Sequence, residues 1–136
     1  MRRPKILLVE DNRLLRWWMM LDLFDAGYWV AGPDTIEEAI HWADTMTFDI
    51  LITDWRLPVG HDGFEMLERV RAKSPEITAL LMSAEMDGEL AEQARSVGFH
   101  RVLTKPFQPG ELLEVLQAIH WAPVAVAVEP RTEVAG

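Results

Sequence analysis

Short apolar runs alternate with longer amphipathic stretches along the chain up to about residue 120. The runs have the length of buried strands, whereas the stretches between them repeat their apolar positions with the period of a helix. Strands that alternate with helices in this way are typical of α/β folds with a parallel sheet. The expected strands are residues 5–9, 28–31, 49–53, 77–82 and 101–104.

Capping residues mark the ends of the helices between these strands. Asn12 can cap a helix that ends near residue 26, where Gly27 stops it. Thr35 with Glu38 three residues later is a capping-box pattern that opens a helix to about residue 45. The remaining helices are expected at about 62–73, 87–98 and 109–120, and they begin at Asp62, Asp87 and Pro109.

Five strands joined by right-handed helical crossovers leave few possible sheet orders. The first, third and fourth runs are the most apolar, so they are expected in the middle of the sheet. We therefore predict an α/β, flavodoxin-like (βα)5 three-layer sandwich with a parallel sheet of order 2-1-3-4-5. One domain is expected over residues 1–120. Residues 121–136 have no amphipathic period and are predicted to be a disordered tail or linker stub rather than an added strand.

Polar residues that could bind a ligand or take part in catalysis directly follow four of the five strands. Because the carboxyl ends of parallel strands share one edge, and ligands bind in the crevice outside it, these side chains are expected to converge. Two carboxylates about 5 Å apart repel by roughly 3 kcal/mol at an effective dielectric near 20, so an acidic cluster needs a cation. Hard oxygen ligands suit Mg²⁺. The residues are Glu10, Asp11, Asp54, Ser83 and Lys105.

The same set of residues suits phosphoryl transfer. A carboxylate can attack phosphorus and form an aspartyl phosphate, which is a recognised covalent intermediate. A bound metal ion would neutralise the incoming phosphoryl group. Lys105 would balance the charge of one phosphoryl oxygen, and the hydroxyl of Ser83 would donate a hydrogen bond to another.

Four short motifs each follow a predicted strand. In chain order they are Val9-Glu10-Asp11, Thr53-Asp54-Trp55 with Leu57-Pro58 behind it, Met82-Ser83-Ala84, and Leu103-Thr104-Lys105-Pro106-Phe107. Each motif is weak alone, but the ordered set is specific. It resembles the receiver domain of two-component response regulators, in a stand-alone form similar to single-domain chemotaxis regulators. The resemblance covers about residues 5–120.

The resemblance implies a role for each site residue. Asp54 would be the phosphoacceptor, while Ser83 and Lys105 would move toward the phosphoryl group and carry the signal outward. The bond between Lys105 and Pro106 is expected to be cis. The implied ligands of Mg²⁺ are Asp11, Asp54, the backbone carbonyl of Arg56 and, through a water molecule, Glu10.

The resemblance also implies partners. The phosphoryl donor would be a phosphohistidine of a sensor histidine kinase or of a histidine phosphotransfer protein, and phosphorylation would switch contacts with a downstream protein target. The fourth and fifth helices would form the surface of any homodimer. The chain would be a signalling protein and not an enzyme, since it would catalyse only its own phosphorylation and dephosphorylation. A pseudo-receiver that binds partners without phosphorylation is the alternative.

Three positions bear on how this chain would differ from other members of the family. Val102 lies three residues before the lysine, where an aromatic switch residue is usual, and it favours the pseudo-receiver alternative mildly. Arg56 and Glu85 occupy the two positions that tune dephosphorylation. We expect their side chains to pair across the phosphoryl group and to hinder water, which would lengthen the phosphorylated lifetime.

The first helix contains more large apolar residues than one buried stripe needs. Trp17 and Trp18, for example, point about 100° apart on a helix, so they cannot both face the core. A surface for docking a kinase helix and a bulky two-sided core are the two interpretations of this surplus.

Composition narrows the function further. With 22 acidic and 13 basic residues the net charge is -9, which disfavours direct binding to nucleic acid. The absence of cysteine excludes disulfides and thiolate chemistry. The first apolar run is too short for a signal peptide or a membrane span, so a soluble cytoplasmic protein is expected.

A flavodoxin would need a phosphate loop where Glu10-Asp11-Asn12 stands. Phosphatases with an aspartyl nucleophile would need a second aspartate at the position of Arg56.

Overall fold

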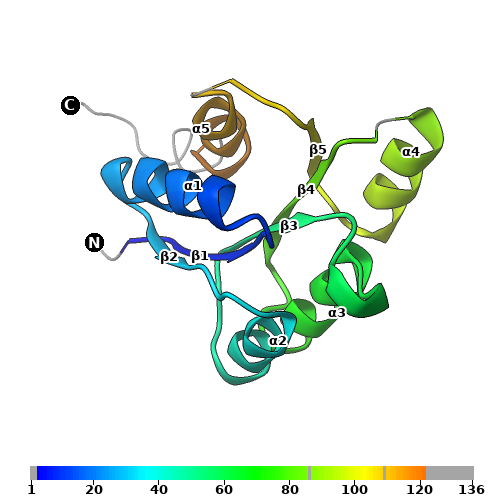
Figure 1. The fold of residues 1–136 in the computed structure, drawn as a ribbon, viewed down its shortest axis with the longest axis horizontal. Helices are drawn as coiled ribbons and strands as arrows, with labels where there is room; N and C mark the ends of the chain where they lie inside the picture. The colour runs from blue at the N-terminus through cyan, green and yellow to red at the C-terminus, as the bar shows by residue number, and fades with distance from the viewer. Residues whose placement is uncertain (1–2, 86, 109, 122–136) are drawn as a thin grey trace. The chain divides into compact units, whose positions relative to one another are not determined.

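A computed structural model describes residues 3–85, 87–108 and 110–121. Five parallel strands form one sheet in the order β2-β1-β3-β4-β5 (Figure 1), which confirms the predicted flavodoxin-like topology. Contacts divide the chain into two compact units, residues 1–106 with the whole sheet and residues 107–136. The strands are β1 Lys5–Val9, β2 Trp29–Ala31, β3 Ile50–Asp54, β4 Thr78–Ser83 and β5 Arg101–Thr104.

Strands β3 and β4 begin and end one residue later than predicted. The ladder between them continues to the pair Asp54 and Met82, and the ladder between β4 and β5 continues to the pair Ser83 and Thr104. Asp54 and Ser83 are therefore the last residues of their strands rather than the first residues of loops. Hydrogen bonding along the ladder limits how far the backbone of each can move.

Four helices of the first unit begin at the predicted caps. The side chains of Asn12, Thr35, Asp62 and Asp87 each accept a hydrogen bond from the backbone N–H three residues later. Each cap satisfies one of the N–H groups that a helix leaves free at its start. The helices are α1 Arg13–Asp25, α2 Ile36–Thr45, α3 Gly63–Lys73 and α4 Gly88–Val97.

The last helix differs from its predicted bounds. The prediction placed its start at Pro109, which lies outside the described residues, whereas α5 is Glu111–Leu116 and continues as a π-helical turn, η2, over Gln117–Trp121. Gly110 has a φ of 91°, a left-handed conformation in which a right-handed helix cannot continue, so the helix starts after it. The predicted tail falls on residues 122–136, which also lie outside the described part of the chain.

Helices cover both faces of the sheet. In Figure 1, α1 lies on one face and α2 and α3 lie on the other. Strand residues are buried in alternation against the two layers. Leu7, Leu51 and Leu81 belong to the core cluster that also contains Met66 and Val70 of α3. With both faces covered, the carboxyl ends of the strands remain as an open edge. Within the described residues no helix is long and apolar enough to cross a bilayer.

Candidate functional site

Three carboxylates meet at the carboxyl ends of β1 and β3. These strands are neighbours, and Val9 pairs with Thr53, so the residues that follow β1 lie beside the end of β3. One carboxylate oxygen from each of Glu10, Asp11 and Asp54 lies within 4.8 Å of the others. Glu10 and Asp54 are buried, whereas Asp11 is exposed. The structure thus brings together the acidic residues that the sequence singled out.

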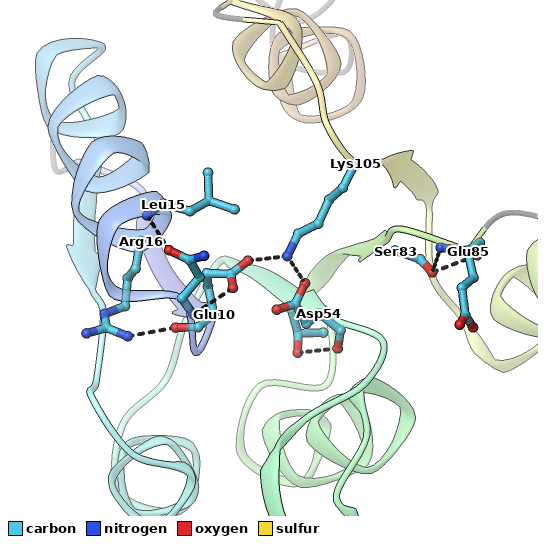
Figure 2. Close-up of polar contacts among 9 residues, drawn as sticks. Glu10, Leu15, Arg16, Asp54, Ser83, Glu85 and Lys105 are labelled. Carbon is cyan, nitrogen blue, oxygen red and sulfur yellow. Dashed lines mark hydrogen bonds and ion pairs between the residues drawn. The ribbon is translucent and has the colours of Figure 1, made fainter.

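Lys105 lies between two of these carboxylates (Figure 2). Its Nζ is 2.5 Å from Oε1 of Glu10 and 2.6 Å from Oδ1 of Asp54. The backbone N–H of Lys105 donates to the carbonyl oxygen of Ser83, which fixes the start of the lysine side chain beside β4. The peptide bond from Lys105 to Pro106 is cis, as predicted. One ammonium group therefore bridges two buried carboxylates.

Burial dominates the electrostatics of Asp54. The pKa of this carboxyl group is raised from 3.8 to about 7. Loss of water is the largest cause of the rise, the hydrogen bond from Lys105 lowers the pKa, and the nearby charge of Glu10 raises it. For Lys105, burial lowers the pKa, but the hydrogen bonds to Asp54 and Glu10 outweigh that effect, so the pKa of the ammonium group is raised. The lysine stays charged near neutral pH, and its single charge does not compensate all the carboxylates.

Glu10 is held from its other side by α1 and its cap. Oε2 of Glu10 accepts a hydrogen bond of 2.9 Å from the backbone N–H of Asn12. The carbonyl oxygen of Glu10 accepts one of 2.8 Å from Nη1 of Arg16. Arg16 is only 5% exposed, and its Nη2 lies 2.5 Å from the carboxylate of Asp34.

The sequence analysis did not single out Arg16. Its spacing offered a signal, since Arg16, Met19 and Leu23 are three and four residues apart and lie on one helical face. An arginine on a stripe that faces the core must find acidic or carbonyl partners, because an unpaired buried charge is costly. Because the opposite face of α1 is also apolar, this spacing alone does not decide which face is buried, and the contact is found only in the tertiary structure.

A pocket of about 220 Å³ opens beside Asp54. Ser83 lies on its wall, where the hydroxyl group donates to the carbonyl oxygen of Glu85 at 2.7 Å and accepts from the N–H of Glu85 at 3.0 Å. To reach a group bound in the pocket, the hydroxyl must leave these two partners. The lining residues are Asp11, Asp54, Trp55, Arg56, Met82, Ser83, Ala84, Glu85 and Lys105.

Arg56 and Glu85 form an ion pair in the lining of this pocket. Nη2 of Arg56 is 3.0 Å from Oε1 of Glu85, and Nε of the same guanidinium is 3.3 Å from that oxygen. Both side chains are largely exposed, so the pair contributes little to the stability of the fold. The pair joins the segments that follow β3 and β4 beside the pocket.

Val102 lies in β5, half-buried, and packs against the main core. It also lines a separate hollow of about 290 Å³ together with Arg95 and Arg101. Because this position carries valine instead of an aromatic residue, a small side chain lies between the core and that hollow. The structure therefore gives Val102 a packing contact with the core, and the lining of the pocket beside Asp54 is made by other residues.

The donor set fits a divalent cation. Three carboxylates supply only hard oxygen ligands, and they converge within the span that one small ion can bridge. The bridging ammonium of Lys105 offsets one negative charge of the three, so an additional cation would relieve the remaining repulsion. The exposed position of Asp11 leaves a route from solvent to these oxygens.

The family model of the response regulator receiver domain matches residues 6–117. Among curated proteins, the transcriptional regulatory protein PhoP of Escherichia coli K12 is 30% identical over 115 residues, which cover 85% of this chain and 51% of PhoP. The virulence transcriptional regulatory protein PhoP of Salmonella typhi matches with the same identity and coverage. The chain spans about half the length of the curated relatives it matches.

Solved structures share the fold. The chemotaxis response regulator CheY4 of Vibrio cholerae is 33% identical, with 85% of this chain and 98% of CheY4 covered and a TM-score of 0.77. The non-phosphorylated HemR receiver domain of Leptospira biflexa is 27% identical, with 96% and 100% covered and a TM-score of 0.77. Because the family model matches most of the chain and the resemblance of its motifs agrees, this chain belongs to the response regulator receiver domain family.

Proposed function

We propose that this chain is a phosphorelay receiver that accepts a phosphoryl group on Asp54 in a reaction that depends on Mg²⁺. The observation that carries the proposal is the environment of Asp54. Its carboxylate is buried beside two further carboxylates, is paired with Lys105 at 2.6 Å, and lines a pocket that opens to solvent. A nucleophile, its charge-balancing cation and a place for the incoming group thus lie together.

Glu10, Asp11 and Asp54 are the residues that would hold the Mg²⁺ ion, together with the backbone carbonyl of Arg56. When bound, the ion neutralises negative charge on the phosphoryl oxygens and on the carboxylates. The chain itself supplies the nucleophilic oxygen and the fixed lysine. The choice of Mg²⁺ is supported by the all-oxygen donor set and by the short distances between its members.

The transfer step follows from these positions. A carboxylate oxygen of Asp54 forms a bond to phosphorus, the P–N bond to the donor histidine breaks, and the electron pair of that bond stays on the imidazole nitrogen, which then takes a proton. Lys105, already in contact with Asp54, pairs with an oxygen of the transferred group. Ser83 donates its hydroxyl hydrogen to another oxygen and releases the carbonyl of Glu85.

Loss of the contact between Ser83 and Glu85 would transmit phosphorylation from the pocket to the start of α4. The hydroxyl group of Ser83 holds both the N–H and the carbonyl of Glu85, two residues before the cap of α4 at Asp87. Loss of both hydrogen bonds would free the segment that connects β4 to α4. We infer that a downstream protein target reads this change, and that any homodimer would use the fourth and fifth helices.

The phosphoryl donor is a phosphohistidine on a sensor histidine kinase or a histidine phosphotransfer protein, and we place the exchange in the cytoplasm. We infer that a helix of the donor protein docks on the exposed apolar face of α1. Leu14 and Trp17 are 77% and 62% exposed, and Leu21 and Phe24 continue the stripe at helical spacing. This stripe lies opposite the buried face of Arg16, Met19 and Leu23, so the apolar surplus of α1 divides between the core and the surface.

Acetyl phosphate, a small phosphoryl donor, tests the proposal without a partner protein. The purified chain is incubated with acetyl phosphate and Mg²⁺, and its intact mass is measured. We expect a labile gain of one phosphoryl group that disappears with chelator and in Asp54→Asn. A gain that persists in Asp54→Asn would assign the acceptor elsewhere. No gain in the wild type would favour the pseudo-receiver, the alternative that Val102 supports, and would exclude an acceptor role.

A further inference from the structure

Arg16 is a buried cation beside the acidic cluster, and the proposed transfer step does not use it. It lies in the first turns of α1, and Figure 2 shows its guanidinium reaching the backbone of Glu10. Taking an arginine out of water costs several kcal/mol unless good partners offset the loss. The two contacts of the guanidinium, to the Glu10 carbonyl at 2.8 Å and to Asp34 at 2.5 Å, supply that compensation.

The backbone at Glu10 needs this support because the sheet does not provide it. Strand β1 ends at Val9, and its ladder to β3 ends with the pair Val9 and Thr53. Glu10 and Asp11 follow the last ladder pair, so the carbonyl oxygen of Glu10 lies beyond the paired residues of β1 and β3. The hydrogen bond from Arg16 takes the place of a ladder bond at the point where the two acidic side chains leave the backbone.

The second contact of Arg16 fixes its own orientation. Asp34 lies in the segment between β2 and α2, and its side chain is 75% exposed. A planar guanidinium that is held at two nitrogen atoms has less freedom than one held at a single atom. The pair thus joins a solvent-exposed carboxylate to a buried carbonyl next to the acidic cluster.

We propose that Arg16 is a positioning residue of the metal site, which fixes the backbone of Glu10 and thereby aims the carboxylates of Glu10 and Asp11. The proposal rests on the proposed function, since it assigns to Arg16 a share of the affinity for Mg²⁺. Partners of metal-site residues typically change metal affinity by 10-fold to 100-fold when they are mutated. A residue that only packed α1 on the sheet would change stability and leave the affinity unchanged.

The test compares variants that separate charge from position. Arg16→Lys keeps the charge but cannot reproduce the planar two-point contact, and Arg16→Met removes both. Arg13→Met is the matched control, since it removes the same charge from the same end of α1 at an exposed position. For each full-length variant, the Kd for Mg²⁺ is measured from tryptophan fluorescence, and the free energy of unfolding is measured with urea without metal.

We expect Arg16→Lys and Arg16→Met to raise the Kd for Mg²⁺ by about tenfold, and Arg13→Met to leave it within about twofold. An unchanged Kd in Arg16→Lys, with any loss of stability, would overturn the positioning role. If Arg16→Met does not fold, Arg16→Lys decides the question. If the wild type does not bind Mg²⁺, the proposed function fails as well, and this outcome is distinct from binding that survives the change at Arg16.

Discussion

Replacement of Asp54 by asparagine should stabilise the protein in the absence of metal. The substitution keeps the shape of the side chain and a carbonyl oxygen that can accept from Lys105, but it removes one of three clustered negative charges. Burial raises the pKa of Asp54 to about 7, so ionisation costs more in the folded protein than in the unfolded chain. The ionised carboxylate of Asp54 therefore destabilises the folded protein.

The magnitude follows from the pKa shift. A group whose pKa is raised by folding stabilises the protein at a pH below its unfolded value, and this stability is lost as the pH rises through the folded value. The loss should therefore develop between about pH 4 and pH 7. A shift of about three pKa units corresponds to at most ~4 kcal/mol. Since the pocket opens to water, which screens the charge, we expect about half, ~2 kcal/mol.

Urea unfolding and thermal melts of both proteins in chelator, at pH 5 and pH 8, measure this difference. Asp54→Asn should be more stable by ~2 kcal/mol at pH 8, an increase in Tm of ~5–10 °C for a domain of this size. The advantage should shrink at pH 5. Saturation to ten times the Kd of Mg²⁺ should restore ~1.4 kcal/mol to the wild type and less to the variant, which lacks one charged ligand.

Two results would refute this reasoning. Equal stability of wild type and variant at pH 8 without metal would mean that Asp54 is not a costly buried charge. An advantage of the same size at pH 5 and pH 8 would trace it to packing or hydrogen bonding instead of ionisation. Groups that do not interact with Asp54 contribute equally to both proteins and cancel in the difference.

Three further changes test separate parts of the site. Lys105→Met should tighten Mg²⁺ binding by about tenfold, because it removes a cation that competes for two of the carboxylates, and it should abolish detectable labelling by acetyl phosphate; weaker Mg²⁺ binding in a fluorescence titration would contradict this. The double variant Arg56→Ala, Glu85→Ala should lose its phosphoryl group several-fold faster than the wild type in a chase followed by intact mass, since the ion pair no longer hinders water; a slower loss would show that the pair does not shield the phosphoryl group. Gly63→Ala should destabilise the protein by ~2–3 kcal/mol in urea unfolding, because the added methyl group would lie 2.5 Å from the backbone carbonyl oxygen of Asp54, whereas Gly88→Ala, also at the first position of a helix but with open space around it, should cost nothing; equal effects would show that the close approach does not matter.

Local patterns were enough to predict most of the elements. A strand is recognised from its own apolar run, and a helix start from a cap and the N–H group three residues later, so the predictions at Asn12, Thr35, Asp62 and Asp87 needed no knowledge of distant residues. The last helix was the exception. Its start depends on the left-handed backbone of Gly110, which its sequence neighbourhood does not require.

The convergence of the acidic residues also followed from the sequence. Once the strands are parallel and their order is known, the residues after β1 and β3 must share an edge, and no side-chain detail enters that argument. The interactions within the site required the tertiary structure. Lys105 and Glu10 are 95 positions apart in the sequence, and only the packing of β5 relative to β1 brings the ammonium within 2.5 Å of the carboxylate.

Arg16 and the apolar stripe of α1 are features that the sequence alone could not assign to the buried or the exposed face of the helix. Both faces of α1 carry large apolar residues, so the sequence alone does not say which face packs on the sheet. The tertiary structure decided that the face with Arg16 is buried and the face with Trp17 is exposed. The physical reason is the Glu10 carbonyl and the Asp34 carboxylate, which satisfy the guanidinium only when α1 is docked in this rotation.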